Sequence, residues 1–243
     1  MENIKRPNEE MKVRINIYRG EHAFGKNNSD VNIVIDVIRA FSLAHCALNR
    51  GAKKIHLVNN TEEAFSLKRK APDIILTGEI GGYPIAGFDV DNSPSSLYRF
   101  NLKNKTLVQK TTNGVKAVLK CLQASYVFVT GFTCARSTAI HINNLIKSKD
   151  IRTINIITSH PSGDDDFACA EFIKAIILNQ KHLSADKVSE RIINSEAAKK
   201  FFNPNNDVFK EDDIKYCATE ISSDFTMQVD ASDSPPSIRK VAL

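Results

Sequence analysis

The sequence predicts an alternating α/β fold with a largely parallel sheet. Short runs of β-branched and aliphatic residues recur along the chain, and stretches with apolar residues at helical spacing separate many of them. Strands that alternate with amphipathic helices are typical of parallel sheets. The chain has 243 residues, 42% of them hydrophobic, so it can bury a sizeable core. We expect one domain over residues 1–243, because no repeat or Gly/Ser-rich linker divides it.

Seven runs have the length and composition of strands, being short and rich in Val, Ile and Thr. The predicted strands are 12–18, 31–37, 54–58, 73–77, 106–110, 126–130 and 153–158. A further run, 222–229, is expected to form a late edge strand. We expect residues 230–243 to form a tail.

Helices are predicted between these strands, and the C-terminal part from about 165 to 220 is expected to be mostly helical. Asn60 or Thr61 can cap one helix, and Asn113 or Gly114 can open another. The predicted helices are 40–49, a helix that follows the cap at 60 or 61, 115–122, 167–180, 184–194, 196–202 and 207–217.

Composition narrows the partners and the compartment. The net charge is +5 and the pI is about 8.9, but Lys and Arg are scattered and form no stripe with aromatic residues. We therefore expect a small anionic substrate and no nucleic acid.

The five cysteines are odd in number and widely spaced, which favours neither disulfides nor a zinc site and predicts a reduced cytoplasmic location. The first eleven residues are polar and no apolar run approaches 18 residues, so no signal peptide and no membrane span are expected. The oligomeric state stays open, a homo-oligomer included.

A glycine-rich loop is expected over residues 78–97. It contains Gly78, Glu79 and Asp89 and leaves through Asn92 and Ser93 before a proline. Glycine lets backbone amides approach a ligand closely, and carboxylates can hold a divalent cation. The alternative is a long surface connection whose glycines only serve turns.

Ligands of open α/β sheets bind outside the carboxyl ends of the strands, and those positions are polar in this chain. Asp36 lies within an apolar run, where an unpaired carboxylate is costly, so it is expected to face Arg39, a cation or a substrate. A structural Asp36–Arg39 ion pair is the competing account. The other polar residues at predicted strand ends are Glu79, Thr111, Thr112, Asn113, Gly114, Ser159, His160, Ser162, Asp164, Asp165 and Asp166.

Two groups at these ends have alternative interpretations, and a third position is a candidate for proton transfer. The turn Thr111–Gly114 between a strand and a helix has the character of a phosphate cradle, or of an ordinary N-cap with a glycine turn. Asp165 or Asp166 is expected to point into the cleft, although acidic residues in a first helical turn often only complement the helix dipole. His160, the one histidine at a predicted strand end, is a candidate proton donor.

Several motifs taken in order resemble the 2-phosphosulfolactate phosphatase family. They are Asp-Val-Ile-Arg-Ala at 36–40, Gly-Glu with Gly-Gly at 78–82, Gly-Phe-Asp followed by Asn-Ser-Pro at 87–94, and Thr-Thr-Asn-Gly at 111–114, within about 31–170. The resemblance implies a three-layer α/β/α sandwich with a largely parallel or mixed sheet. It also implies a Mg²⁺-dependent phosphatase that converts 2-phospho-3-sulfolactate to 3-sulfolactate and phosphate, on a route to sulfolactate or coenzyme M.

The resemblance also implies roles for individual residues. Asp36, Glu79 and Asp89 would lie near the metal or the attacking water, with Asp165 as a further metal ligand and Asp166 and His160 as catalytic groups. Arg39, Asn92, Ser93 and the turn of Thr111, Thr112, Asn113 and Gly114 would bind the substrate.

Some positions depart from the family pattern. Ile80 stands where an arginine is usual and Asp91 where a glycine is usual, and Cys134 and residues 159–162 also differ. The alternatives are a ligand-binding homologue with lost or altered activity and a phosphatase for another small phosphorylated acid. A haloacid-dehalogenase-type nucleophile at Asp89 is disfavoured, because glycines interrupt the approach to it where that motif needs a strand.

Overall fold

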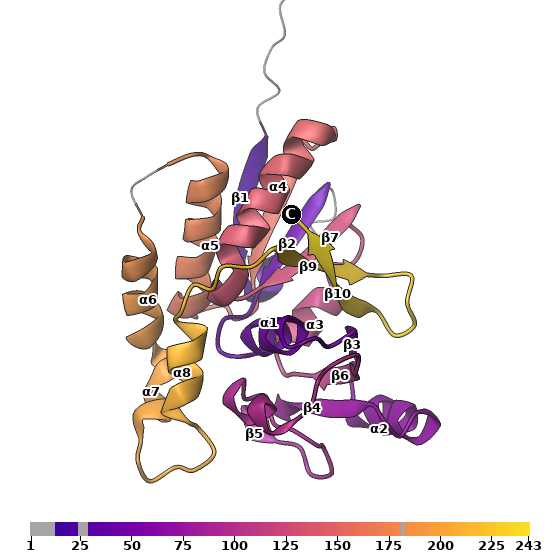
Figure 1. The fold of residues 1–243 in the computed structure, drawn as a ribbon. Helices are drawn as coiled ribbons and strands as arrows, with labels where there is room; N and C mark the ends of the chain where they lie inside the picture. Colours follow the sequence, from indigo (N-terminus) through magenta and orange to yellow (C-terminus); the bar gives the residue numbers. More distant parts are fainter. Residues whose placement is uncertain (1–12, 24–28, 181–182) are drawn as a thin grey trace, which may run out of the picture.

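The computed structural model describes residues 13–23, 29–180 and 183–243, and these contain a ten-stranded mixed sheet (Figure 1). The α/β prediction is confirmed. Lys12 and the first eleven residues lie outside the described part. The sheet order is β1-β8-β2-β7-β9-β10-β3-β6-β4-β5. The strands are β1 (Arg14–Arg19), β2 (Val31–Ile35), β3 (Lys54–Leu57), β4 (Ile75–Ile80), β5 (Tyr83–Pro84), β6 (Thr106–Lys110), β7 (Tyr126–Thr130), β8 (Thr153–Thr158), β9 (Phe225–Asp230) and β10 (Ser237–Ala242).

Two parallel groups of strands are joined by an antiparallel hairpin. β1, β8, β2 and β7 pair in parallel, as do β3, β6 and β4. β9 pairs with β7, and β10 pairs with β3, both antiparallel. The predictions of an edge strand at 222–229 and of a tail at 230–243 are therefore wrong. The second strand of the hairpin was missed because only Ser237 and Ile238 of β10 are buried, so its sequence has no apolar run.

The helices cover both faces of the sheet. Residues of α1 and α3 form one core cluster with both parallel groups, and Figure 1 shows these two helices between the upper and lower halves of the molecule. α4, α5 and α6 cover the other face at β2 and β7, and α2 covers it at β4 and β6. The helices are α1 (Ala40–Asn49), α2 (Thr61–Lys70), α3 (Gly114–Leu119), α4 (Ala135–Ser148), α5 (Asp164–Ile177), α6 (Ala185–Ile193), α7 (Glu196–Lys199) and α8 (Glu211–Cys217).

Local signals explain several element boundaries. Asn60 caps α2, as predicted, by accepting the Glu63 N–H at 2.8 Å. β4 continues three residues beyond the predicted end, so Gly78 and Glu79 belong to the strand and not to a loop. α3 ends at Leu119, short of the predicted 122. The glycine-rich loop is thus shorter than the expected 78–97, and the carboxylate of Glu79 belongs to strand β4 of the sheet.

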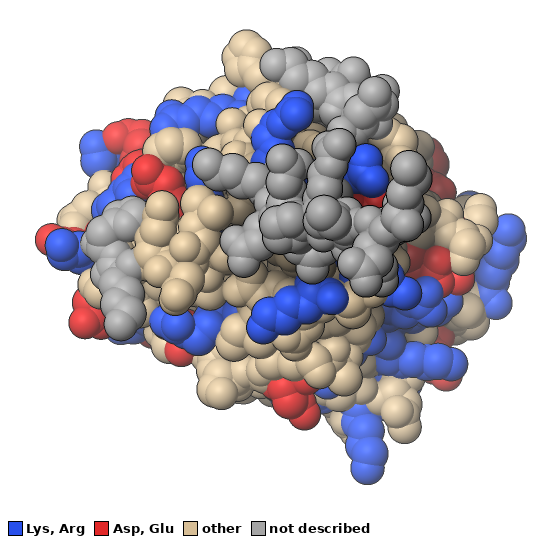
Figure 2. All heavy atoms as spheres, turned by 90° about the horizontal axis from the view of Figure 1, so that it is seen from above, with Lys and Arg blue, Asp and Glu red and all other residues tan. Residues whose placement is uncertain are grey.

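The distribution of charged side chains on the surface and the state of the cysteines both match the expectations from the sequence. On the face that Figure 2 shows, Lys and Arg side chains are spread among acidic and neutral ones. The five cysteines are all buried and free, at positions 46, 121, 134, 169 and 217. Among the described residues, no helix has both the length and the apolar character needed to cross a membrane.

Gly78 is required where β4 meets β6. Its φ is +150°, and a Cβ there would lie 1.9 Å from the carbonyl oxygen of Lys110. We expect Gly78→Ala to lower the free energy of unfolding by more than about 3 kcal/mol, because strain and a backbone clash add. Gly81 is the matched control: its φ is +60° and a Cβ would meet nothing within 4 Å, so Gly81→Ala should cost about 1–2 kcal/mol. Denaturant unfolding of both variants measures the difference, and equal costs would contradict this account.

Candidate active site

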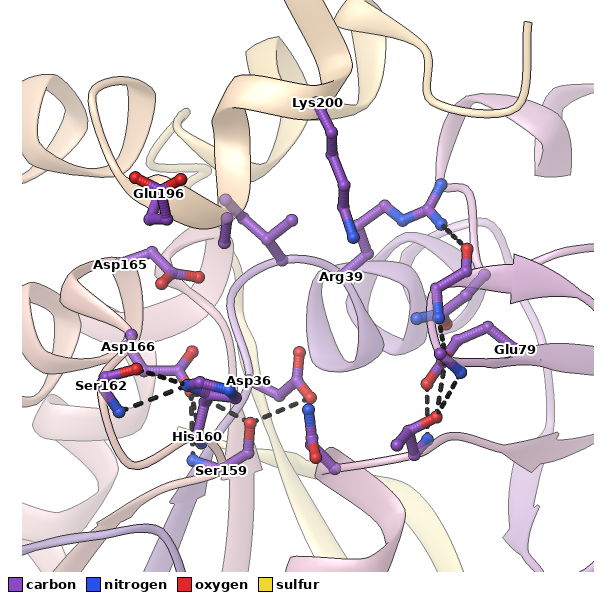
Figure 3. A pocket seen from close by; sticks show the side chains of 18 of the residues that line it. Asp36, Arg39, Glu79, Ser159, His160, Ser162, Asp165, Asp166, Glu196 and Lys200 are labelled. Atoms are coloured by element: carbon purple, nitrogen blue, oxygen red, sulfur yellow. Dashed lines mark hydrogen bonds between the residues drawn. The ribbon is translucent and has the colours of Figure 1, made fainter. Parts of the chain in front are cut away.

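A cavity of about 420 Å³ lies at the carboxyl ends of strands from both halves of the sheet (Figure 3). Its lining comes from the segments that follow β2, β4, β6 and β8, from the start of α5, and from α7 and the 3-10 turn Lys200–Phe202. β2 and β8 pair so that Ile35 lies opposite Thr158. This register places the next residues, Asp36 and Ser159, side by side at the cavity.

Asp36 is buried at the base of the cavity. Its Oδ1 accepts the Ala40 N–H at 3.0 Å, at the start of α1, and its Oδ2 lies 3.1 Å from Ser159 Oγ. Gly114 makes room for it, since a Cβ there would stand 2.6 Å from Oδ2. Burial raises the pKa of Asp36 to about 6, and the charges of Asp165 and Glu79 add to the shift, against the hydrogen bond from Ala40.

Asp165 and Asp166, both buried in the first turn of α5, have different surroundings. Asp166 accepts the Val37 N–H at 2.8 Å, the Ser159 N–H at 3.1 Å and the Ser159 hydroxyl at 3.0 Å, and so ties the ends of β2 and β8 together. Asp165 faces the open cavity in Figure 3. Burial raises its pKa to about 6, while backbone N–H groups, including that of Ile38, lower it. Burial and the negative charges of Asp165 and Asp36 also raise the pKa of Asp166.

The remaining acidic residue of this helical turn does not face the cavity. Asp164 is exposed and pairs with Arg191. Asp165 also interacts with backbone N–H groups of this first turn, which favours its charged form. The expectation that Asp165 or Asp166 points into the cleft matches their place in the cavity lining.

Glu79 holds two loops of the opposite wall together. One carboxylate oxygen accepts the Thr112 N–H, and the other accepts the Gly82 N–H and the Thr112 hydroxyl, the last at 2.9 Å. The Gly81 N–H donates to the same hydroxyl at 2.8 Å. Glu79 lines the cavity, but its oxygens are engaged by these donors.

Arg39 is paired with a residue that the sequence did not indicate. Its Nη1 lies 2.8 Å from Asp213 Oδ2, with both side chains almost fully buried, and its Nη2 donates to the Gly82 carbonyl at 3.2 Å. Asp213 also accepts from the Ser93 hydroxyl at 2.7 Å and from the Ser95 N–H at 3.1 Å. The alternative of a structural Asp36–Arg39 pair is therefore wrong. The signal that could have found Asp213 is its place on the apolar face of α8, four residues before the buried Cys217.

Only some residues of the two predicted substrate-binding turns line the cavity. Asn92 and Asn113 line the cavity, and Asn92 Oδ1 lies 3.4 Å from Gln109 Nε2. Ser93 is fully buried against Asp213 and does not line the cavity. Thr111 accepts the Val115 N–H, in the first turn of α3, at 2.9 Å, whereas the N-cap residue Asn113 makes no side-chain capping bond.

One amide group of the expected phosphate cradle, that of Thr112, and the amide of the next residue after the turn, Val115, are already engaged. The Thr112 N–H donates to Glu79 and the Val115 N–H donates to Thr111. Gly114 is buried and contributes space for Asp36 instead. The turn therefore shapes the cavity, with Thr112 and Asn113 as its lining residues.

Asp89 is not brought together with the other carboxylates. It accepts the Leu76 N–H at 2.8 Å and pairs with Lys68 of α2 at 2.9 Å, at a partly exposed position outside the cavity. The resemblance implied that Asp89 lies near a metal or an attacking water. The structure corrects this expectation, because Asp89 lies outside the cavity and pairs with Lys68. A sequence motif could not show that this part of the loop runs back along β4 toward α2.

His160 stands at the rim of the cavity, and its tautomer follows from its partners. The Ser162 N–H, which can only donate, lies 3.2 Å from His160 Nδ1. Nδ1 must therefore be the acceptor, and a neutral ring carries its proton on Nε2.

The wall opposite these loops comes from the C-terminal helices, and sequence analysis missed it. Glu196, Lys200 and Phe201 line the cavity. Figure 3 shows Lys200 beside Arg39, across the cavity from Asp36 and Asp166. No local pattern marks these residues, because they lie in a stretch with the composition of an ordinary surface helix.

The chain is similar to proteins with a shared name. The family model described as 2-phosphosulpholactate phosphatase matches residues 18–231. A protein of Bacillus subtilis (strain 168), named "Probable 2-phosphosulfolactate phosphatase", is 48% identical over 229 residues, which are 94% of this chain and 99% of that relative. A relative of the same name from Caldicellulosiruptor saccharolyticus is 36% identical over 182 residues (73% and 74%). Another, from Clostridium perfringens (strain SM101), is 31% identical over 204 residues (78% and 82%).

The agreement extends over nearly the whole described chain, including the strands and loops that form the cavity. The matched residues run from β1 to the end of β9 and therefore include every residue that lines it. The chain belongs to the 2-phosphosulfolactate phosphatase family, a family of phosphoric monoester hydrolases.

Proposed function

We propose that this chain hydrolyses 2-phospho-3-sulfolactate to 3-sulfolactate and phosphate with the aid of Mg²⁺. The observation that carries the proposal is the pair Asp36 and Asp165, two buried carboxylates that share one cavity with the cations Arg39 and Lys200. The names of the relatives support the substrate.

The charge of the cavity supports a divalent cation. Among the described lining residues, five carboxylates face two cationic side chains. The proposed substrate is itself an anion, with a phosphate ester, a carboxylate and a sulfonate. A bound cation would offset the repulsion between the two, which a poorly solvated cavity makes costly.

The available oxygen atoms suit magnesium. Mg²⁺ is usually held by one or two carboxylates, with waters and substrate phosphate oxygens completing the shell. Asp36 and Asp165 would supply the carboxylates, whereas Glu79 is engaged by its own hydrogen bonds and Asp89 lies elsewhere. Within the described ranges, no three or more His, Cys, Asp or Glu side chains gather into a protein-only metal site. When bound, Mg²⁺ neutralises charge on the transferring phosphoryl group.

The protein's own groups can carry the remaining tasks. Hydrolysis of a phosphate ester needs an aligned water, donors to the phosphoryl oxygens and a proton for the departing alkoxide. Arg39, held in place by Asp213, and Asn92 would orient the substrate. Asp165, which faces the cavity, would orient the attacking water. His160 would donate a hydrogen bond from Nε2–H to the leaving oxygen, and the proton released by the attacking water would pass to the departing alkoxide.

Three of the departures from the family pattern, at positions 80, 91 and 134, lie outside the cavity lining, whereas Ser159, His160 and Ser162 of the differing segment 159–162 line it. Ile80 is 54% exposed at the end of β4, and neither Ile80 nor Asp91 lines the cavity. Cys134 is buried and also lies outside it. The argument for a ligand-binding homologue rested on a lost cation and a gained anion in the pocket, so these positions no longer favour it.

Phosphate release from 2-phospho-3-sulfolactate tests the proposal. We expect Mg²⁺-dependent turnover that Asp36→Asn lowers by at least about 100-fold, because the cavity loses one of its two open carboxylates. Asp89→Asn is the matched control and should retain activity within a few-fold, since Asp89 pairs with Lys68 outside the cavity. Absence of turnover by the unsubstituted chain, with binding of phosphate or Mg²⁺ retained, would favour the ligand-binding alternative.

Thermal unfolding without divalent cations tests the surroundings of Asp165. A carboxyl whose pKa is raised on folding to about 6 binds its proton more tightly in the folded state, so stability falls as pH rises from about 4 to about 6 and stays lowered above. Asp165→Asn should therefore stabilise the chain by roughly 1–3 kcal/mol at pH 7.5 and by little near pH 4. Asp164→Asn is the control and should give no such gain. A gain independent of pH would contradict a titrating origin.

Asp213 is expected to position Arg39. Asp213→Asn leaves a buried guanidinium without its counter-charge, so we expect a loss of about 3 kcal/mol in stability and a raised KM for the phosphorylated substrate. Asp212→Asn alters a neighbouring exposed residue whose contact with Lys215 is 3.4 Å, and should change stability by less than about 0.5 kcal/mol. Denaturant unfolding and steady-state kinetics measure both effects, and an unchanged KM in a folded Asp213→Asn variant would remove the positioning role.

A further inference from the structure

Lys200 is a cation of the cavity that lacks an acidic partner. Within the described ranges, its Nζ makes no ion pair and no hydrogen bond, and lies over the rings of Phe209 and Phe201 at 4.4 and 5.7 Å from their centroids. Figure 3 shows its side chain reaching down into the cavity from the C-terminal wall. The ammonium group is therefore held by aromatic faces and directed toward the open space.

The other cation of the cavity is compensated. Arg39 forms a buried ion pair with Asp213 at 2.8 Å, so its positive charge is balanced within the protein. Lys200 has no such balance at hydrogen-bond distance, although the charge of Glu79 reaches it through space. Lys200 is an exposed residue, but partial burial of its side chain and the charge of Arg39 lower its pKa, and the protonated lysine has no nearby counter-charge at hydrogen-bond distance in the described part of the chain. An anion placed between Arg39 and Lys200 would supply it.

The backbone next to Lys200 is shaped for close approach. Gly82 has a φ of +89°, and a Cβ at this position would lie 3.0 Å from Lys200 Nζ. The glycine thus leaves the ammonium group free to lie against the loop after β4. Phe201, which also lines the cavity, adds an apolar surface beside the charge. The cation–π contacts with Phe209 and Phe201 hold the ammonium group in place, and the apolar rings offer a surface for a methylene group next to a bound anion.

We propose that Lys200 binds the sulfonate group of the substrate and sets the preference for a sulfonated over a sulfonate-free phosphate ester. The inference rests on the proposed function, in which the phosphoryl group lies at Asp36 and Asp165. Lys200 stands across the cavity from Asp36, so it meets the other end of a substrate that spans the two walls. A sulfonate is a permanent anion, so its attraction to the Lys200 ammonium group does not depend on the protonation state of the substrate.

Steady-state kinetics with two substrates test this assignment. The substrates are 2-phospho-3-sulfolactate and 2-phospholactate, which differ only in the sulfonate. Lys200→Met keeps an unbranched apolar stem on Phe209 and removes the charge. We expect it to lower kcat/KM for the sulfonated substrate about 10- to 100-fold, mainly through KM, and to leave kcat/KM for 2-phospholactate within about threefold. Lys187→Met, on the exposed face of α6, is the matched control and should change neither.

Each other outcome has a defined meaning. An equal loss with both substrates would show that Lys200 meets the phosphate or the carboxylate, and would overturn the sulfonate assignment. No loss with either substrate would also overturn it. If the unsubstituted chain turns over neither substrate, the proposed function fails first, and binding then decides the sulfonate assignment: calorimetry with 3-sulfolactate and lactate should show a preference for 3-sulfolactate in the unsubstituted chain. Lys200→Gln, a second variant that guards against misfolding of the first, should abolish that preference, and a preference that survives in folded Lys200→Gln would overturn the assignment.

Discussion

Burial of α1 on every side is the constraint on which the rest of the structure depends. Positions 40 to 48 of this helix are all buried, so no face of it is left for water. A helix of this kind needs cover all round, and the two parallel groups of strands supply it together with α3. The β9–β10 hairpin joins the two groups into one sheet. Because both groups of strands pack on α1, the carboxyl ends of β2 and β4 meet at one cavity, with Asp36 on one side and Glu79 on the other.

The carboxylates that line the cavity or lie behind its wall are of two kinds, which differ in the hydrogen-bond donors around them. Glu79, Asp166 and Asp213 accept hydrogen bonds from backbone amides, hydroxyls or a guanidinium, and they hold segments from different parts of the chain together. Asp36 and Asp165 line the cavity and have pKa values raised to about 6. Burial raises the pKa of Asp166 as well, so the negative charges of Asp36, Asp165 and Asp166 are all unfavourable in the folded chain, and a cation or a substrate can relieve them.

The C-terminal helices complete the cavity rather than merely cover the sheet. α8 supplies the counter-charge for Arg39 and fastens the segment at Ser93 to the same carboxylate. The 3-10 turn after α7 supplies Lys200 and Phe201. The phosphoryl chemistry proposed for the strand ends and the sulfonate contact proposed for this wall therefore come from different parts of the sequence. Such a division lets one part set the reaction and the other the substrate.

The sequence by itself determined the α/β class, most of the parallel strands and the idea that polar residues at their carboxyl ends meet, because these follow from local hydrophobic periodicity and from the geometry of parallel sheets. Asp36 and Asp165 were found in this way. Only the tertiary structure decided that β10 lies inside the sheet, that Asp89 pairs with Lys68 outside the cavity, and that Asp213 neutralises Arg39. Pairings of this kind join residues far apart in the chain and depend on burial and on neighbouring charges, and no local pattern of residues carries that information.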